Sequence, residues 1–376
     1  KEDFPILKYL EDEGDIVEPD YFLPIIPMVL VNGSAGIGTA FSTTIPSFNP
    51  VEIANNILNK MENKPLKHMM PYYYGFKGKV EHITESQYKI SGIYKIINEN
   101  TVRITELPLA GHLCWIEKYE EFLKKLLPDA KSDQKKKDTA TKIVNYSSNC
   151  TNNKIDFEVV FRGNELQKLV KKKQETGEDE IEKYLKLSAK MSTTNLCLYN
   201  EKGFNITKYE SAEDILENFY EFRLKKYEVR RKHHLKLLNN ELTMLKYKVK
   251  FIDDVIEDKI IIKKKKKEEI IEKLVSRSYP KMSKILDAPE DSKTYDYLTS
   301  MSLFSLTREK IDELNKEYDA KKQEHDEYNS TTPKDLWKKE IEEFIKFYNE
   351  WIIERGENEL NVKKTKTKTR TKSRTK

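Results

Sequence analysis

The chain has 376 residues, of which 35% are charged, and this length suits two or three domains because it exceeds what one ordinary core needs. The 68 Lys and Arg residues nearly balance the 63 Asp and Glu residues, which excludes a uniformly basic or acidic protein. The three cysteines, Cys114, Cys150 and Cys197, are an odd number without CxxC spacing, so we expect a reducing compartment, no disulfide framework and no metal site. The longest apolar run is too short to span a membrane, and no secretory signal begins the chain, so we expect a soluble intracellular protein.

Residues 31–43 read VNGSAGIGTAFST and place three glycines, Gly33, Gly36 and Gly38, around one isoleucine, Ile37. A phosphate-binding loop is excluded because no lysine follows the last glycine, and the G-x-G-x-x-G order of dinucleotide-binding loops is absent. A β-branched apolar side chain on a glycine loop has no helix face or strand neighbour to bury it. Two interpretations stay open at this point: Ile37 packs inward as a loop anchor, or it is exposed to contact a partner.

The next part of the chain predicts an α+β region. Asn49 can cap a helix in residues 49–63, with Pro50 at its first position. Apolar residues then follow a period near two, and strands are predicted in residues 78–86, 87–107 and 153–162. Two further features are predicted, a polar surface loop in residues 128–142 and a hairpin in residues 185–209 with its turn at 200–203.

Residues 211–258 contain neither Gly nor Pro and predict one long helix, with Ser211 as a cap and acids in the first turn. Its second half carries a heptad seam, formed by Leu235, Leu238, Leu242, Leu245, Val249, Ile252 and Ile256. The same rhythm recurs in a second run, at Ile311, Leu314, Tyr318, Lys321, His325 and Tyr328. We therefore predict an antiparallel pair of helices with a compact tip at about 259–307. An ordinary long core helix is the alternative.

The last fourteen residues contain eight Lys or Arg and no acid, whereas the rest of the chain is close to neutral. Spaced like charges repel one another and cannot bury a core, so this composition predicts a disordered basic arm that is attracted to nucleic acid. A nuclear address is a second function that such an arm can serve, and a solubilising tail is the alternative.

No Ser-His-Asp or Cys-His arrangement follows from the spacing, but seven segments carry a resemblance. In chain order they are PIIPMVLVNGSAGIGTAFSTTIPSFNP, YYYGFKG, ITELP, LKLSAKMSTTN, FYEFRLKKYEVRR, YDYLTSMSLFSLTREK and TPKDLW. Together they resemble the breakage-reunion core of type IIA DNA topoisomerases, as found in the DNA topoisomerase II of eukaryotes and large viruses. Members of that family are homodimers that cut one duplex on both strands, pass another through it with ATP, and reseal the cut.

The resemblance assigns Ile37 as the wedge that intercalates between base pairs of the gate duplex and bends it, with Gly33, Gly36 and Gly38 as loop support. The physics suits this role, because glycines let the backbone approach the minor groove and a β-branched side chain is a stiff apolar wedge. Unstacking a base step costs on the order of a few kcal/mol, which is offset by the protein surface that a bent duplex can contact.

The resemblance also assigns residues 186–195 as the segment that contacts the DNA arm beside the cut. These residues are Lys186, Leu187, Ser188, Ala189, Lys190, Met191, Ser192, Thr193, Thr194 and Asn195. Lysines, hydroxyls and amides are suited to phosphate contacts, which position DNA without reading its sequence. An amphipathic strand without a DNA contact is the alternative.

The family's catalytic tyrosine, its Mg²⁺ site and its ATPase domain correspond to positions upstream of residue 1, so we expect no catalytic and no metal-binding residue in this chain. Mg²⁺ and ATP are expected to bind outside it. The chain also departs from the family's usual loop, with Ser34 and Ala35 where Ala and an acid are usual, and Ala40 and Phe41 where Gly and Trp are usual. Ala40 leaves less room for a positive φ, which leaves the shape of the loop open.

We therefore predict an α+β fold in four parts. They are the end of a winged-helix domain (1–50), an α+β tower or shoulder domain (51–208), a coiled-coil arm with a helical dimer gate at its tip (209–350) and a disordered basic tail (351–376). The predicted function is that of an ATP-dependent type II DNA topoisomerase, an isomerase that relaxes and decatenates double-stranded DNA. We expect a homodimer through the coiled-coil tip, no membrane, and a location in the nucleus or a cytoplasmic viral factory. The alternative is a non-enzymatic DNA-bending or chromatin scaffold protein.

Overall fold

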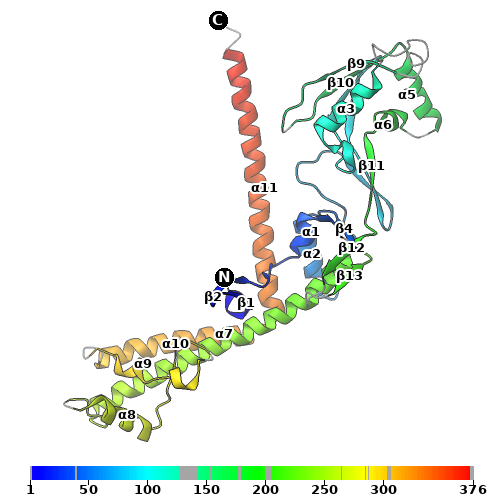
Figure 1. The fold of residues 1–376 in the computed structure, drawn as a ribbon. Coiled ribbons are helices and arrows are strands. Elements are labelled where there is room, and N and C mark those ends of the chain that lie inside the picture. Colours follow the sequence, from blue (N-terminus) through cyan, green and yellow to red (C-terminus); the bar gives the residue numbers. More distant parts are fainter. Residues whose placement is uncertain are drawn as a thin grey trace. The chain divides into compact units, whose positions relative to one another are not determined.

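The structure is a computed structural model that describes residues 2–38, 40–127, 142–152, 154–176, 179–199, 205–263, 265–283, 285–286, 288–302 and 306–372, with side chains described for all of these except 176 and 357–372. The chain divides into two compact units, one formed by Ile26–Phe219 and the other by Lys1–Ile25 with Tyr220–Lys376 (Figure 1). The four predicted parts are bounded at other positions, and their boundaries stay a prediction. Most of the predicted loop at 128–142 and the turn at 200–203 lie outside the described residues.

The unit Ile26–Phe219 begins with two short helices around a hairpin. Helix α1 (Met28–Asn32) leads into β3 (Ser34–Ile37) and β4 (Ser42–Ile45), which pair antiparallel, and α2 (Pro50–Met61) follows. The Asn49 side chain accepts a hydrogen bond from the Val51 N–H at 2.9 Å, so the predicted cap of this helix is confirmed. Ile53 and Ile57 face inward and are fully buried.

Two antiparallel sheets form the larger part of this unit. The first has the order β11-β6-β5, from β5 (Lys79–Thr84), β6 (Gln87–Ser91) and β11 (Ser188–Ser192). The second has the order β7-β8-β10-β9, from β7 (Ile93–Asn98), β8 (Thr101–Glu106), β9 (Ile143–Ser148) and β10 (Phe157–Phe161). Strand β11 therefore pairs with a strand that lies about a hundred residues earlier in the chain.

Helices cover the second sheet and complete its core. They are α3 (Ile116–Leu126), α5 (Glu165–Thr176) and α6 (Glu180–Tyr184), and a short 3₁₀ turn, η2 (His112–Cys114), precedes α3. Val102 and Phe157 from the strands pack with Tyr119 and Leu123 from α3, and all four are fully buried. A last hairpin, β12 (Leu196–Tyr199) with β13 (Ile206–Tyr209), confirms that the predicted hairpin region contains an antiparallel pair.

The long helix α7 (Ala212–Ile256) begins in this unit and continues into the other. Within the first unit, its first turns are attached by Glu213, whose carboxylate accepts the Met69 N–H at 2.8 Å, and by Glu217, which pairs with Lys60 at 2.5 Å. The length of 45 residues agrees with the helix predicted from the absence of Gly and Pro.

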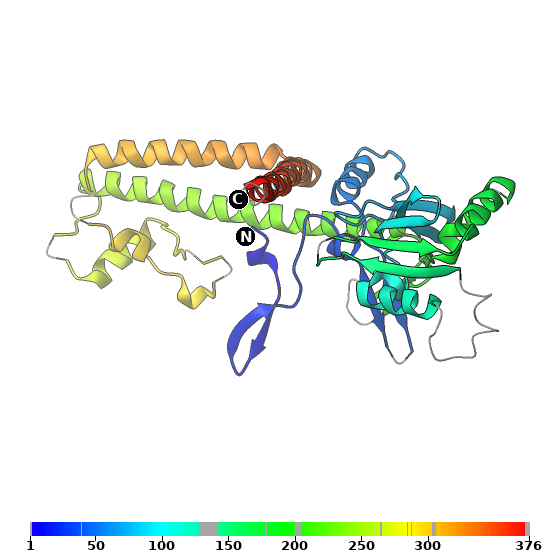
Figure 2. The ribbon, with the colours of Figure 1, turned by 90° about the horizontal axis from the view of Figure 1, so that it is seen from above.

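Helix α10 (Arg308–Ser330) runs beside α7 (Figure 2). Leu245 and Ile252 of α7 bury against Leu314 of α10. Farther along, the His234 and Tyr328 rings lie 4.4 Å apart. The residue numbers rise along one helix as they fall along the other, so the predicted antiparallel pair is confirmed.

Residues between these two helices form a separate small core, as predicted. It contains α8 (Lys267–Ser276), η3 (Glu290–Ser292) and α9 (Asp296–Thr299). Phe251 and Leu274 pack there with Tyr279, Tyr295 and Leu298. The buried Asp254 carboxylate accepts bonds from the Arg277 guanidinium at 2.8 and 2.9 Å. Burial alone would raise the pKa of Asp254, but the bonds from Arg277 and Tyr279 hold it below its usual value.

The first and last segments of this unit meet on α7. The N-terminal segment contains η1 (Phe4–Ile6), β1 (Tyr9–Asp12) and β2 (Asp15–Pro19), and helix α11 (Pro333–Lys372) ends the described chain. Trp337 of α11 is fully buried between the rings of Tyr220 and Tyr227, and its indole N–H donates to the Ile25 carbonyl at 3.0 Å. Buried Arg223 binds Asp3 at 2.7 Å.

Helix α11 corrects the predicted disordered tail, because it continues to Lys372. Extending a helix that is already formed costs less than nucleating one, and residues 357–372 contain no Gly or Pro to stop it. Among the described helices, none combines the length and apolar character that crossing a membrane would need.

Candidate nucleic-acid interface

The hairpin β3–β4 holds its shape through backbone features at its base and its tip. At the base, Gly33 has a φ of +69°, and an added Cβ would lie 2.8 Å from the Ile45 carbonyl oxygen. At the tip, the Gly38 N–H donates to the Phe41 carbonyl at 2.7 Å. An added Cβ at Gly36 would meet no atom within 4 Å. Gly33 is therefore required by the fold of the hairpin itself, whereas Gly36 is free of such a requirement.

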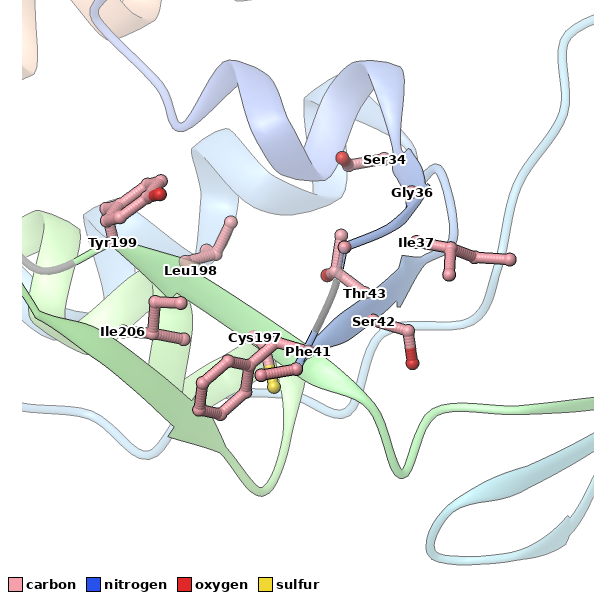
Figure 3. Close-up of a pocket in the computed structure, with 12 residues that line it drawn as sticks. Ser34, Gly36, Ile37, Phe41, Ser42, Thr43, Cys197, Leu198, Tyr199 and Ile206 are labelled. Atoms are coloured by element: carbon pink, nitrogen blue, oxygen red, sulfur yellow. The ribbon is translucent and has the colours of Figure 1, made fainter.

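Ile37 ends β3 and is 95% exposed. Its side chain points away from the hollow that the neighbouring side chains line (Figure 3). Ile45, which closes the same hairpin, is 3% exposed. Inward packing of Ile37 is therefore not what the structure has, and its apolar surface is available to a partner.

A hollow lies beside the hairpin, between its strands and the hairpin β12–β13 (Figure 3). Phe41, Tyr199 and Ile206 line it and are 54%, 69% and 39% exposed. The sequence indicates Phe41 only as a departure from the family's usual residue, and it does not indicate Tyr199. An aromatic residue at the end of a predicted strand is the one signal that could have pointed to Tyr199.

The predicted DNA-contacting segment 186–195 contains strand β11, which lies at the edge of its sheet. Lys190 is exposed and lies directly opposite Lys89 of β6. Lys89 pairs with Glu182 at 2.7 Å. Lys186 is exposed, has a φ of +50°, and places its ammonium 5.0 Å from the centre of the Phe122 ring. Two exposed lysines thus mark this strand and its entry.

The remaining residues of this segment differ in exposure. Leu187 is fully buried in the core, and Thr193 is 6% exposed with its N–H bonded to the Ser86 carbonyl at 2.9 Å. Ser188, Ala189 and Met191 are half-buried. Ser192 and Thr194 are exposed, and their hydroxyls bond each other at 3.0 Å. The structure therefore places Leu187 and Thr193 where they stabilise the strand.

Asn195 brings the two predicted sites together. Its carbonyl accepts the Thr44 N–H at 2.9 Å, and its side-chain amide donates to the Ser42 hydroxyl oxygen. Both partners lie on β4, the strand that pairs with the one carrying Ile37. The exposed isoleucine and the lysine-bearing strand thus belong to one connected surface of the unit Ile26–Phe219.

The chemistry of this surface is that of binding. Burial raises the pKa of Tyr73 and, together with the Glu213 charge, raises the pKa of Tyr88 to about 12. Both phenols therefore stay protonated at neutral pH and are poor nucleophiles. Within the described ranges, no group of three or more His, Cys, Asp or Glu side chains is arranged to hold a metal ion.

A glycine-flanked exposed isoleucine beside a lysine-bearing strand, on an α+β unit whose long helix enters an antiparallel pair, defines the class of architecture that the seven segments predict. The family model for DNA gyrase/topoisomerase IV, in its A-type polypeptide, matches residues 1–342. The chain belongs to this family.

Curated relatives agree with this membership. The chain is 34% identical to DNA topoisomerase 2 of Acanthamoeba polyphaga mimivirus, a match that covers 97% of this chain and 32% of that protein. It is also 34% identical to DNA topoisomerase 2 of Plasmodium falciparum, over 90% of this chain and 25% of that protein. DNA topoisomerase 2-alpha of Gallus gallus gives 34% identity, with 90% and 22% covered. The chain thus spans between about a fifth and a third of the length of these relatives.

A solved structure extends the likeness to the fold. The DNA-binding, cleavage and re-ligation domain of Plasmodium falciparum topoisomerase II superimposes with a TM-score of 0.74 at 32% identity. The match covers 94% of this chain and 48% of that one. The α+β fold with a helical arm, predicted from the sequence, is confirmed.

Proposed function

We propose that this chain is the part of an ATP-dependent type II DNA topoisomerase that binds and bends the gate duplex. The observation that carries the proposal is Ile37, a β-branched side chain that is 95% exposed at the end of a hairpin. A folded protein has no reason of its own stability to present such a side chain on a supported hairpin. A wedge that enters stacked bases needs this arrangement.

The bending step follows from stiffness and exposure. Ile37 has few accessible rotamers, so it can separate a base step without folding back. Gly38, on the C-terminal side of Ile37, adds no side chain that would block the approach of the duplex. The cost of unstacking, on the order of a few kcal/mol, is offset by contacts that the bent arms make with the protein.

The arm contacts are assigned to the strand that carries Lys190, with Lys186 at its entry. Ammonium groups that are exposed on one connected surface with Ile37 can neutralise phosphates and release counterions. Such contacts fix the register of the duplex and carry no sequence information, which suits an enzyme that acts at many sites. Within residues 186–195, the exposed positions are the ones proposed to touch DNA.

The complete enzyme requires groups outside this chain. The catalytic tyrosine, Mg²⁺ and ATP are proposed to reside in parts of the polypeptide that these residues do not include. The exposed apolar side chains of Ile261, Val275 and Ile285, at 59%, 56% and 74%, support a homodimer through the tip of the arm. Relatives in eukaryotes and in a mimivirus support a location in the nucleus or in a viral factory.

The wedge is tested by the bend angle of a duplex labelled with a fluorescent donor and acceptor at its two ends. Wild-type protein should raise the transfer efficiency on binding, and Ile37→Ala should return it most of the way to that of free DNA. Ile16→Ala is the matched control, because Ile16 is also a hairpin isoleucine and is 71% exposed. A wedge at Ile37 is ruled out when Ile37→Ala bends DNA as sharply as its parent.

A further inference from the structure

We infer that Asn195 is a positioning residue for the Ile37 hairpin and does not act by touching DNA. The inference rests on the proposed function, in which Ile37 bends the duplex. It reassigns one member of the segment 186–195, all ten residues of which the family resemblance assigns to DNA contact.

Asn195 supports the strand opposite Ile37 at two points. Its carbonyl binds the Thr44 N–H at 2.9 Å, and its amide binds the Ser42 hydroxyl. Ser42 is the direct cross-strand partner of Ile37. The second bond of Asn195 therefore holds the residue that faces Ile37 across the hairpin.

The hairpin needs this support because it has little of its own. Each strand has four residues, and a two-stranded hairpin by itself is marginally stable in water. Three of the four β3 residues are exposed, including Gly36 and Ile37, so few apolar contacts hold that strand in place. The edge of β4 that does not pair with β3 is the edge that Asn195 binds.

Asn195 can transmit rigidity because its own neighbours are fixed. Thr193, two residues before it, is buried and bonded to the Ser86 carbonyl at 2.9 Å. Leu196, which follows it, is 1% exposed and begins β12. Asn195 is therefore held between two buried anchors, and the hairpin is attached through it to the three-stranded sheet.

This arrangement matters when DNA is bound. Separated bases tend to restack, and they press back on the side chain between them. A hairpin that tilts under this load would let the step close without releasing the duplex. Loss of the Asn195 bond should therefore reduce bending while the phosphate contacts, and with them the affinity, stay nearly unchanged.

The test compares affinity and bending in the same titration of the doubly labelled duplex. Asn195→Ala and Ser42→Ala should each lower the ratio of bent to unbent complexes by about fivefold, the effect of one lost hydrogen bond. Their affinity for DNA should stay within about threefold of wild type. Thr194→Ala is the control, since the Thr194 hydroxyl bonds Ser192 within its own segment and not the hairpin.

Asn195→Asp separates positioning from DNA contact. The carboxylate can still accept a bond from the Ser42 hydroxyl, so this variant should bend DNA more than Asn195→Ala does. A residue that touched phosphate would behave in the opposite way, because a carboxylate repels the backbone and would weaken binding beyond the alanine variant. That result, or wild-type bending by both alanine variants, would overturn the inference. A wild-type protein that leaves DNA straight would instead overturn the proposed function.

Discussion

Position 33 shows how one residue fixes the site. Gly33 ends α1 with a φ of +69°, and the Ile45 carbonyl lies where a Cβ would be. Gly36, three residues later, has no such neighbour. The two glycines of one motif therefore have different physical requirements, although they look equivalent in the sequence.

Replacing these two glycines should separate fold from function. Gly33→Ala should destabilise the unit by about 1–3 kcal/mol, because an L-residue is strained at this φ and its Cβ meets a carbonyl oxygen. Gly36→Ala should leave stability nearly unchanged. Urea unfolding followed by circular dichroism gives both values. Equal stability of the two variants would mean that the hairpin can shift to another backbone geometry at little cost.

Lys186 and Lys190 should act on affinity without sequence preference. Lys186→Glu with Lys190→Glu should weaken binding to all duplexes alike and reduce the slope of log K against log salt by about 2. Lys316→Glu with Lys322→Glu on α10 makes the same change in net charge and is the control. Because Lys186 also contacts Phe122, Lys190→Glu alone is measured beside it. Affinity that is unchanged at low salt in both variants would remove these lysines from the DNA surface.

Part of this site was predictable from sequence and part was not. The exposure of Ile37 follows from a β-branched residue among glycines, which is local information. The bond between Asn195 and Ser42 joins residues 153 positions apart, and no periodicity encodes it. The burial of Leu187 and Thr193 depends in the same way on the strand that β11 pairs with.

At the scale of elements, helices were easier to predict than sheets. The seam between α7 and α10 follows from the three-four spacing within each helix, since both faces are written in continuous sequence. The order β11-β6-β5 and the order β7-β8-β10-β9 depend on pairings between distant strands. The contact of Trp337 with Tyr220 and Ile25 likewise required the structure.

The four-stranded sheet contains an ion pair with a pH signature. Asp156 precedes β10, and its nearly buried carboxylate accepts two bonds of 2.7 Å from Arg103 of β8. The Arg103 bonds, with Lys154, lower the pKa of Asp156 to about 2. Because the folded-state pKa lies below that of the unfolded chain, the contribution is fully present above about pH 4 and is lost as the pH falls through about 2.

Asp156→Asn should remove this dependence. The pair should contribute about 1–2 kcal/mol at neutral pH, since Arg103 is partly exposed and screening reduces its strength. Unfolding midpoints measured between pH 2 and 6 should fall more steeply for wild type than for the variant. Parallel curves over this range would show that Asp156 has no special role in the acid stability of the sheet.

At the scale of the whole molecule, the chain combines a DNA-binding unit with a helical arm. Helix α7 belongs to both units, and the chain crosses between them a second time at residues 25–26. The match to the DNA gyrase/topoisomerase IV family covers residues 1–342, so it includes parts of both units. The proposed enzyme therefore uses one unit to bend the gate duplex and the other to form the exit gate.

Decatenation of interlinked DNA circles by the complete gene product tests this account most directly. With ATP and Mg²⁺ the wild-type protein should separate the circles, and Ile37→Ala should do so at least about tenfold more slowly, the effect of losing about 1.4 kcal/mol of DNA deformation. Omitting ATP should abolish the reaction in both. A wild-type product that binds and bends DNA but never separates the circles would contradict the account and favour a DNA-bending scaffold protein.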